Sequence, residues 1–251
     1  EITADLPRID LLKIDVEGFE ELARSESVQA RAKEIREALG DPETIFLGID
    51  RLDYTKGIRH RLKAYGELLA DGDLDVDHDI LVQVASPSRE RVESYKVLRE
   101  QVEGMVGHLN GQYDTMGHTA IRYLHHGYPF EEMVALYLAT DVMLVTSLRD
   151  GMNLVAKEFV AAKADGSGRL VLSEFTGAAD QLKQAILVNP HDIDDLKLLM
   201  LAAKAMPDDE ARKRMRAMRR QVLTHDVDAW QEAFLNDLAA LRRRNDDAQE
   251  S

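Results

Sequence analysis

The chain has 251 residues, 45% of them hydrophobic and 31% charged, which is enough apolar material for one large packed domain, or one domain plus a piece of another. The formal net charge of −14 at pH 7 disfavours nucleic acid or an anionic membrane as the main partner, because both reward basic surfaces. The absence of cysteine excludes disulfides, thiolate metal sites and cysteine nucleophiles, and it fits a reducing compartment such as the cytoplasm.

The N-terminal residues EITADLPRID contain neither a basic region nor a long apolar one, so no signal peptide is expected. The chain begins with Glu1 rather than methionine, from which we expect a fragment of a longer protein. The most apolar run, MVALYLATDVMLVTSL, is interrupted by Thr140 and Asp141 and is shorter than a membrane span requires.

Six short runs rich in aliphatic and β-branched residues recur along the chain, and each is followed by a segment with helical periodicity. The expected strands are 44–49, 80–85, 120–124, 142–148, 170–175 and 185–190. The expected helices are 58–71, 88–107, 130–139, 153–164, 176–184 and 191–206, with further charged helix from 207 to 244. This alternation predicts an α/β fold with a parallel sheet and helices on both faces, and ligands in such folds bind at the carboxyl ends of the strands.

The segment DRLDYTKG follows the first of these strands and places two cations five residues apart. Arg51 offers a forked donor and Lys56 a point charge, a combination that suits a diphosphate. Gly57 would let the next helix start close to bound oxygens. The alternative, left open by spacing alone, is a surface pair of Arg51 with Asp53 and a solvated lysine.

The segment SPSRERVESY follows the second strand and offers another anion site. Ser86 or Ser88 is expected to cap a helix, with Arg89 in its first turn, where the helix dipole disfavours a cation. A bound phosphate would justify Arg89 at that place. A merely exposed arginine is the alternative.

The segment RDGMNLVAKE follows the fourth strand. Asp150 follows the strand, Gly151 turns the chain, and Asn153 is expected to cap a helix that carries Glu158. The helix N-terminus can bind phosphate, and the carboxylates can accept hydrogen bonds from sugar or ribose hydroxyls. An ordinary cap with a solvated glutamate is the alternative.

Alternating aspartates in DGDLDVDHDI suggest a calcium loop, but the pattern fails at two positions. Val76 stands where such a loop needs glycine, and Val82 stands where it needs a bidentate glutamate. The adjacent His125 and His126 would point to opposite sides of a strand. We therefore expect no metal site.

Five motifs, in this order, closely resemble the trehalose-6-phosphate synthase family: GIDRLDYTKGI, SPSRERVESY, LNGQY, SLRDGMNLVAKEFVAA and VLSEFTGAADQL. The resemblance implies the C-terminal, donor-binding half of a GT-B glycosyltransferase with two facing Rossmann-like domains. It further implies transfer of glucose from UDP-glucose to glucose 6-phosphate, with retention of configuration and without metal or cofactor.

The resemblance also implies roles for individual residues. Arg51 and Lys56 would hold the donor diphosphate and stabilise the leaving nucleotide, Asp150 would contact the transferred glucose, and these three would be the catalytic residues. Arg89 would bind the acceptor phosphate. The remaining donor contacts implied are Tyr128, Asn153, Leu154, Val155 and Glu158. Departures from the family pattern are Ser147 for a usual proline, His118 for tryptophan and Phe130 for a basic residue.

The predicted organisation has three parts. Residues 1–26 are read as an interdomain strand and linker, 27–225 as the nucleotide-sugar-binding domain, and 226–251 as a cross-over helix with a frayed tail. In the family, the helix around Trp230 returns to the N-terminal domain, which is missing here. We therefore expect its apolar face to be exposed or used for self-association. Residues 9–20, IDLLKIDVEGFE, also resemble a strand segment of FkbM-type methyltransferases.

Three points stay open at this stage. The chain could be a catalytic half that is inactive alone, or a non-catalytic nucleotide-sugar-binding module that partners a full-length synthase. It could also be another retaining transferase, related to glycogen or sucrose synthases. The sequence does not decide between a uracil and a guanine base in the donor.

Overall fold

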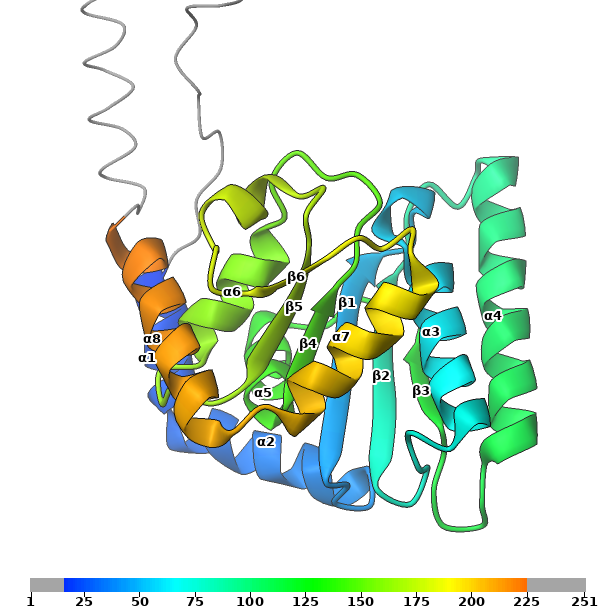
Figure 1. Ribbon diagram of the computed structural model, residues 1–251, viewed down its shortest axis with the longest axis horizontal. Helices are drawn as coiled ribbons and strands as arrows, with labels where there is room; N and C mark the ends of the chain where they lie inside the picture. Colours follow the sequence, from blue (N-terminus) through cyan, green and yellow to red (C-terminus); the bar gives the residue numbers. More distant parts are fainter. Residues whose placement is uncertain (1–15, 225–251) are drawn as a thin grey trace, which may run out of the picture.

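The computed structural model describes residues 16–224, which form one parallel sheet between two layers of helices (Figure 1). The strand order is β3-β2-β1-β4-β5-β6, and every neighbouring pair is parallel. The strands are β1 (Thr44–Arg51), β2 (Asp79–Ser86), β3 (Ile121–Leu124), β4 (Val142–Val145), β5 (Arg169–Ser173) and β6 (Ile186–Val188). Each predicted strand run overlaps one of them, so the predicted α/β fold class is confirmed.

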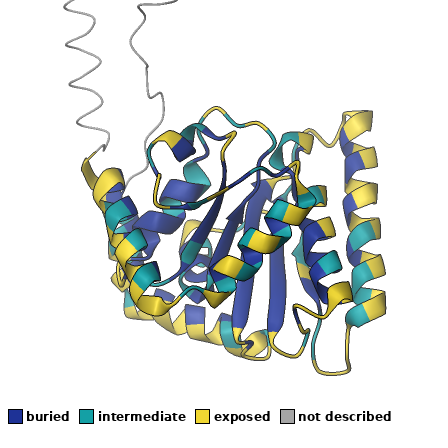
Figure 2. Cartoon of the chain, viewed as in Figure 1, coloured by how far each residue is buried: buried dark blue, intermediate teal, exposed yellow. Residues whose placement is uncertain are grey.

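Helices cover the two faces of the sheet unequally. One face packs against α1 (Val16–Arg24), α2 (Glu26–Ala38), α5 (Phe130–Ala139), α6 (Leu154–Ala162) and α8 (Asp208–Thr224). The other face packs against α3 (Ile58–Asp71), α4 (Glu93–Tyr113) and α7 (Ile193–Ala205). Figure 2 shows the strands as the most deeply buried layer, which explains why their sequences are almost continuously apolar.

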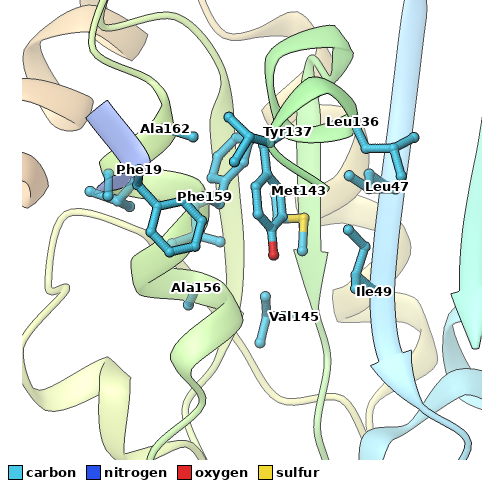
Figure 3. Packing of buried hydrophobic residues seen from close by; sticks show 14 of the residues in the cluster. Phe19, Leu47, Ile49, Leu136, Tyr137, Met143, Val145, Ala156, Phe159 and Ala162 are labelled. Atoms are coloured by element: carbon cyan, nitrogen blue, oxygen red, sulfur yellow. The ribbon is translucent and has the colours of Figure 1, made fainter. Parts of the chain in front are cut away.

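Aromatic rings fill the space between the sheet and the helices of the first face (Figure 3). Tyr137 of α5 contacts Phe159 of α6 edge-on, with ring centroids 6.2 Å apart, and Phe19 of α1 lies 6.4 Å from Tyr137. Each buried ring or aliphatic side chain of this kind stabilises the fold by about 1.5–3 kcal/mol relative to exposure. This packing holds the N-terminus of α6 at a fixed place beside the sheet.

Two of the predicted helices differ in the structure. The helix predicted for 88–107 begins at Glu93 and extends to Tyr113, its N-cap is Val92, and neither Ser86 nor Ser88 caps it. The reason is the backbone of Arg89, whose φ of 48° lies in the left-handed region and cannot continue a right-handed helix. The predicted helix 176–184 is reduced to the short 3₁₀ helix η2 (Gly177–Asp180).

The N-terminal segment also differs from its prediction. Residues 16–24, read from the sequence as part of a strand and linker, form α1, which packs against α5 and α6. Residues 1–15 and the predicted helix around Trp230 lie outside the described residues, so the domain boundaries stay predictions. Within residues 16–224, no helix combines the length and apolar character needed to cross a membrane.

Candidate functional site

The site lies between β1 and β4, where the order in which successive strands are added to the sheet changes side. From β1 the chain runs outward to β2 and β3, whereas from β4 it runs outward to β5 and β6 on the other side. In open parallel sheets the carboxyl ends of the two central strands frame a ligand crevice at this point. Arg51 ends β1, Lys56 follows it, and Asp150 follows β4, so the structure places all three at this crevice.

The loops after β1 and β4 are packed directly against each other. Gly57 ends the short 3₁₀ helix η1 (Tyr54–Lys56) with a φ of 66°, and a Cβ there would lie 2.1 Å from the carbonyl oxygen of Thr146. The backbone N–H of Leu148 donates to the carbonyl of Thr55 over 2.7 Å. Only glycine permits both the left-handed backbone and this close approach.

Lys56 and Asp150 form an ion pair across the two loops. The Lys56 Nζ lies 2.5 Å from Asp150 Oδ2, and about 15% of each side chain is exposed. Asn153 Nδ2 also donates to Asp150 Oδ2, over 3.1 Å. The alternative reading of a solvated lysine is therefore wrong. Arg51, the last residue of β1, is exposed. Its guanidinium makes no hydrogen bond or ion pair with a residue in the described part of the chain, but its charge helps to lower the pKa of the Asp53 carboxyl.

The start of α6 closes the crevice from the β4 side. Asn153 has a φ of 72°, and its Oδ1 accepts a hydrogen bond from the N–H of Ala156 over 3.0 Å, which confirms the predicted cap. Leu154 and Val155, in the first turn, are half-buried against the core. A helix start of this kind presents N–H groups and the positive end of the helix dipole to an anion.

Glu158 is half-buried on α6 rather than solvated. Its Oε2 accepts a hydrogen bond from the hydroxyl of Tyr137, over 2.8 Å. Burial raises the pKa of the Glu158 carboxyl above its ordinary value of 4.5, and the hydrogen bond from Tyr137 offsets only part of that rise. A carboxylate held in this way can accept hydrogen bonds from a diol.

The raised pKa of Glu158 predicts a pH-dependent difference from the Glu158→Gln variant. The folded state binds a proton more readily than the unfolded state, so the stability from this proton is present below about pH 4.5 and is lost as pH rises through the folded pKa. Urea unfolding at several pH values should show wild type losing stability relative to the variant. Tyr137→Phe removes the hydrogen bond that lowers the pKa of Glu158, so the stability should be lost over a wider pH range in this variant. Equal pH dependence of the unfolding free energy in wild type and Glu158→Gln would contradict the expectation.

A buried ion pair lies directly beneath these loops and was not identified from the sequence. Arg61 of α3 is fully buried, and its Nη2 lies 2.7 Å from Oδ2 of Asp50 on β1. The same guanidinium donates to Oγ1 of Thr146 over 3.2 Å and to the carbonyl of Lys56 over 3.4 Å. Gly48 makes room for it, since a Cβ there would meet Arg61 Nη1 at 1.7 Å.

Two predicted contacts lie further from this centre. Arg89 sits in the loop after β2, where its Nη1 donates to the hydroxyl of Tyr95 over 2.7 Å. Tyr128 follows β3, contacts the ring of His126 and lines a groove of about 290 Å³ with Glu132. No hydrogen bond joins the Tyr128 side chain to Lys56. The predicted contact of the Tyr128 backbone with the donor stays a prediction.

Metal-binding residues do not cluster in the part of the chain that the structure describes. No group of three or more His, Asp or Glu side chains there is placed to hold a metal ion. The prediction of a reaction without metal or cofactor therefore still depends on the sequence and the family resemblance alone.

The strand order, with charged residues at the carboxyl ends of the two central strands, is that of a Rossmann-like domain. Residues 9–240 match the family model described as glycosyltransferase family 20. The trehalose-6-phosphate synthase of Mycobacterium leprae is 56% identical over 234 residues, which are 93% of this chain and 47% of that protein. The chain belongs to glycosyltransferase family 20, and the resemblance found in its motifs is confirmed.

Solved structures agree with this assignment. The α,α-trehalose-phosphate synthase (UDP-forming) of Burkholderia xenovorans, in complex with glucose-6-phosphate, gives a TM-score of 0.86 at 35% identity, covering 91% of this chain and 50% of that one. A structure from E. coli bound with UDP-2-fluoro glucose gives a TM-score of 0.84 at 35% identity, covering 90% and 50%. The chain thus spans about half the length of the relatives it matches.

Proposed function

We propose that this chain is the donor-binding half of an α,α-trehalose-phosphate synthase, which transfers glucose from UDP-glucose to glucose 6-phosphate with retention. The observation that carries the proposal is the Lys56–Asp150 pair at the crevice between β1 and β4, with the exposed Arg51 at the end of β1. The proposal is supported by the relatives, of which one structure holds glucose-6-phosphate and another UDP-2-fluoro glucose.

Each group at the crevice has a chemical task in this proposal. Lys56 and Arg51 bind the donor diphosphate and stabilise its charge as it leaves, an electrostatic contribution of about 2.7–4 kcal/mol for a well-placed donor. Asp150 binds hydroxyls of the transferred glucose. Glu158 accepts hydrogen bonds from the ribose, and the start of α6 binds the phosphate oxygens.

The reaction needs no protein nucleophile in this scheme. The bond between the anomeric carbon and the diphosphate oxygen breaks, and a bond to the hydroxyl oxygen of glucose 6-phosphate forms on the same face. The departing diphosphate oxygen takes the proton that this hydroxyl loses, so the products are trehalose 6-phosphate and UDP. The enzyme contributes position and charge neutralisation.

A calorimetric titration of UDP-glucose and of GDP-glucose into the 251-residue chain tests the donor assignment. We expect saturable binding of UDP-glucose, and a loss of about tenfold or more in Arg51→Ala, because a hydrogen bond to a charged group contributes about 1.5–3 kcal/mol. Arg59→Ala, an exposed arginine of α3 that bonds Gln101, is the control and should bind as wild type does. Absence of donor binding by the folded wild-type chain would contradict the proposal.

Turnover is a separate question from donor binding. Mixing the chain with a separately expressed N-terminal half should restore glucose transfer, because a cleft between two domains cannot be closed by one of them. Donor binding without restored transfer would favour the non-catalytic module. We place the protein in the cytoplasm as part of this proposal, in keeping with its lack of cysteine.

A further inference from the structure

Three side chains connect the loop after β2 to the loop after β1. Arg89 Nη1 donates to the hydroxyl of Tyr95, the first buried tyrosine of α4, over 2.7 Å. That hydroxyl in turn donates to Oδ2 of Asp53 over 3.0 Å. A phenol has one proton to give and lone pairs to accept with, so Tyr95 serves both partners at once.

The inner end of this connection is fixed. Tyr95 is 5% exposed and Asp53 is 6% exposed. The other oxygen of Asp53, Oδ1, accepts from the N–H of Thr55 over 2.9 Å and from its hydroxyl over 2.8 Å. Asp53 is therefore tied to the turn that carries Lys56, and it caps η1.

The outer end is available for a ligand. Arg89 is exposed, and the bond from Nη1 to Tyr95 is the one hydrogen bond that its guanidinium makes within residues 16–224. Its carbon Cζ lies 5.5 Å from the centroid of the Tyr95 ring, so the ring supports the guanidinium as well. A guanidinium has five N–H donors, which leaves four for an anion.

The charges along the connection also agree with this arrangement. Burial alone would raise the pKa of the Asp53 carboxyl, but the hydrogen bonds from Thr55 and Tyr95 outweigh burial and lower it. Burial and the contact with Asp53 raise the pKa of the Tyr95 hydroxyl. At neutral pH Arg89 is therefore a cation, Tyr95 a neutral phenol and Asp53 an anion. Tyr95 holds the Arg89 side chain in place without a direct ion pair, which would occupy more of the N–H donors of the guanidinium.

We propose that Tyr95 is a positioning residue, which holds the phosphate-binding arm of Arg89 in register with the donor turn at 53–56. The inference rests on the proposed function, since it takes the anion at Arg89 to be the phosphate of a sugar phosphate. Holding the arm in advance removes part of the rotamer entropy that a free arginine loses on binding. The positive φ of Arg89 is explained in the same way, because the strained backbone aims the side chain at Tyr95.

The test is an NMR titration of glucose 6-phosphate, and of glucose as a probe without phosphate, into isotope-labelled wild type, Tyr95→Phe, Arg89→Ala and the double variant. Phenylalanine keeps the ring and removes only the hydroxyl. We expect Tyr95→Phe to weaken the binding of glucose 6-phosphate about three- to tenfold, the range of one hydrogen bond. In the Arg89→Ala background the same substitution should have little effect on binding. Tyr113→Phe, at the other end of α4, where the hydroxyl accepts a hydrogen bond from Gln112, is the matched control.

The outcomes separate this inference from the proposed function. Equal affinity of wild type and Tyr95→Phe for glucose 6-phosphate, or additive effects in the double variant, would overturn the positioning role. A wild-type chain that binds glucose 6-phosphate no better than Arg89→Ala does would overturn it as well. UDP-glucose is titrated in parallel: its binding tests the donor assignment alone, and we expect Tyr95→Phe to change it by less than about threefold.

Discussion

Replacing Arg61 by methionine is expected to lower the free energy of unfolding by about 3–5 kcal/mol, the usual effect of removing one partner from a buried ion pair. Arg61 is fully buried, and its partner Asp50 is 8% exposed. Methionine fills much of the space but leaves Asp50 as an unpaired carboxylate among apolar side chains. Chemical denaturation followed by circular dichroism measures the loss.

The physical cause predicts how this loss varies with pH. Burial raises the pKa of Asp50, and Arg61 opposes that rise more than Lys56 does, so the pKa rises further in the Arg61→Met variant. A raised folded-state pKa means that stability is lost as pH rises. The deficit of the variant should therefore be larger at about pH 8 than at about pH 5. A deficit that does not change with pH would indicate lost packing rather than an unpaired charge.

Two further variants separate the charge from the packing. The double variant Asp50→Leu, Arg61→Met removes both charges and should be less destabilised than Arg61→Met alone, since apolar replacement of a whole buried pair is often neutral. Arg59→Met changes an exposed arginine two positions away and should cost less than about 0.5 kcal/mol. Equal stability of Arg61→Met and Arg59→Met would contradict the prediction.

The strands and the residues at their ends were predictable because two local signals coincide there. Continuous apolar runs mark strands buried on both faces, and charged residues that interrupt them mark the carboxyl edge. Lys56 and Asp150 are 94 residues apart in the chain, yet their place after β1 and β4 brings them together once the sheet has this order. Asn153 was predictable as a cap by its residue type alone.

The pairs that hold the loops in place were not predictable, because they join distant elements through residues with no distinctive spacing. Tyr95 and Asp53 are 42 positions apart, and Arg61 and Thr146 are 85 apart. Arg61 did leave a signal: it lies three positions after Ile58, on the apolar face of its helix. The helix start at Glu93 was missed for another reason, since the residue type of Arg89 does not predict its positive φ of 48°.

Replacing Lys56 by alanine is expected to weaken UDP binding about ten- to a hundredfold, because a hydrogen bond between charged groups contributes about 1.5–3 kcal/mol. Asp150 Oδ2 lies 2.5 Å from Lys56 Nζ, so a diphosphate bound as proposed would compete with a carboxylate for this ammonium group. Isothermal calorimetry with UDP measures the effect on the phosphate contact alone, since UDP lacks the glucose that Asp150 is proposed to bind. Lys63→Ala, an exposed lysine on α3, is the control.

Because of this competition, a substitution of Asp150 should change the affinity for UDP in the opposite direction to Lys56→Ala. Asp150→Asn releases Lys56 and should strengthen binding of UDP, while the preference for UDP-glucose over UDP declines because the glucose loses its carboxylate partner. In the Lys56→Ala background the gain from Asp150→Asn should vanish, as expected for two residues that act through one contact. If Asp150→Asn weakened the binding of UDP as much as Lys56→Ala does, Asp150 would be positioning Lys56 for the diphosphate rather than competing with the diphosphate for it. If Lys56→Ala bound UDP as wild type does, the diphosphate would not lie at the crevice between β1 and β4.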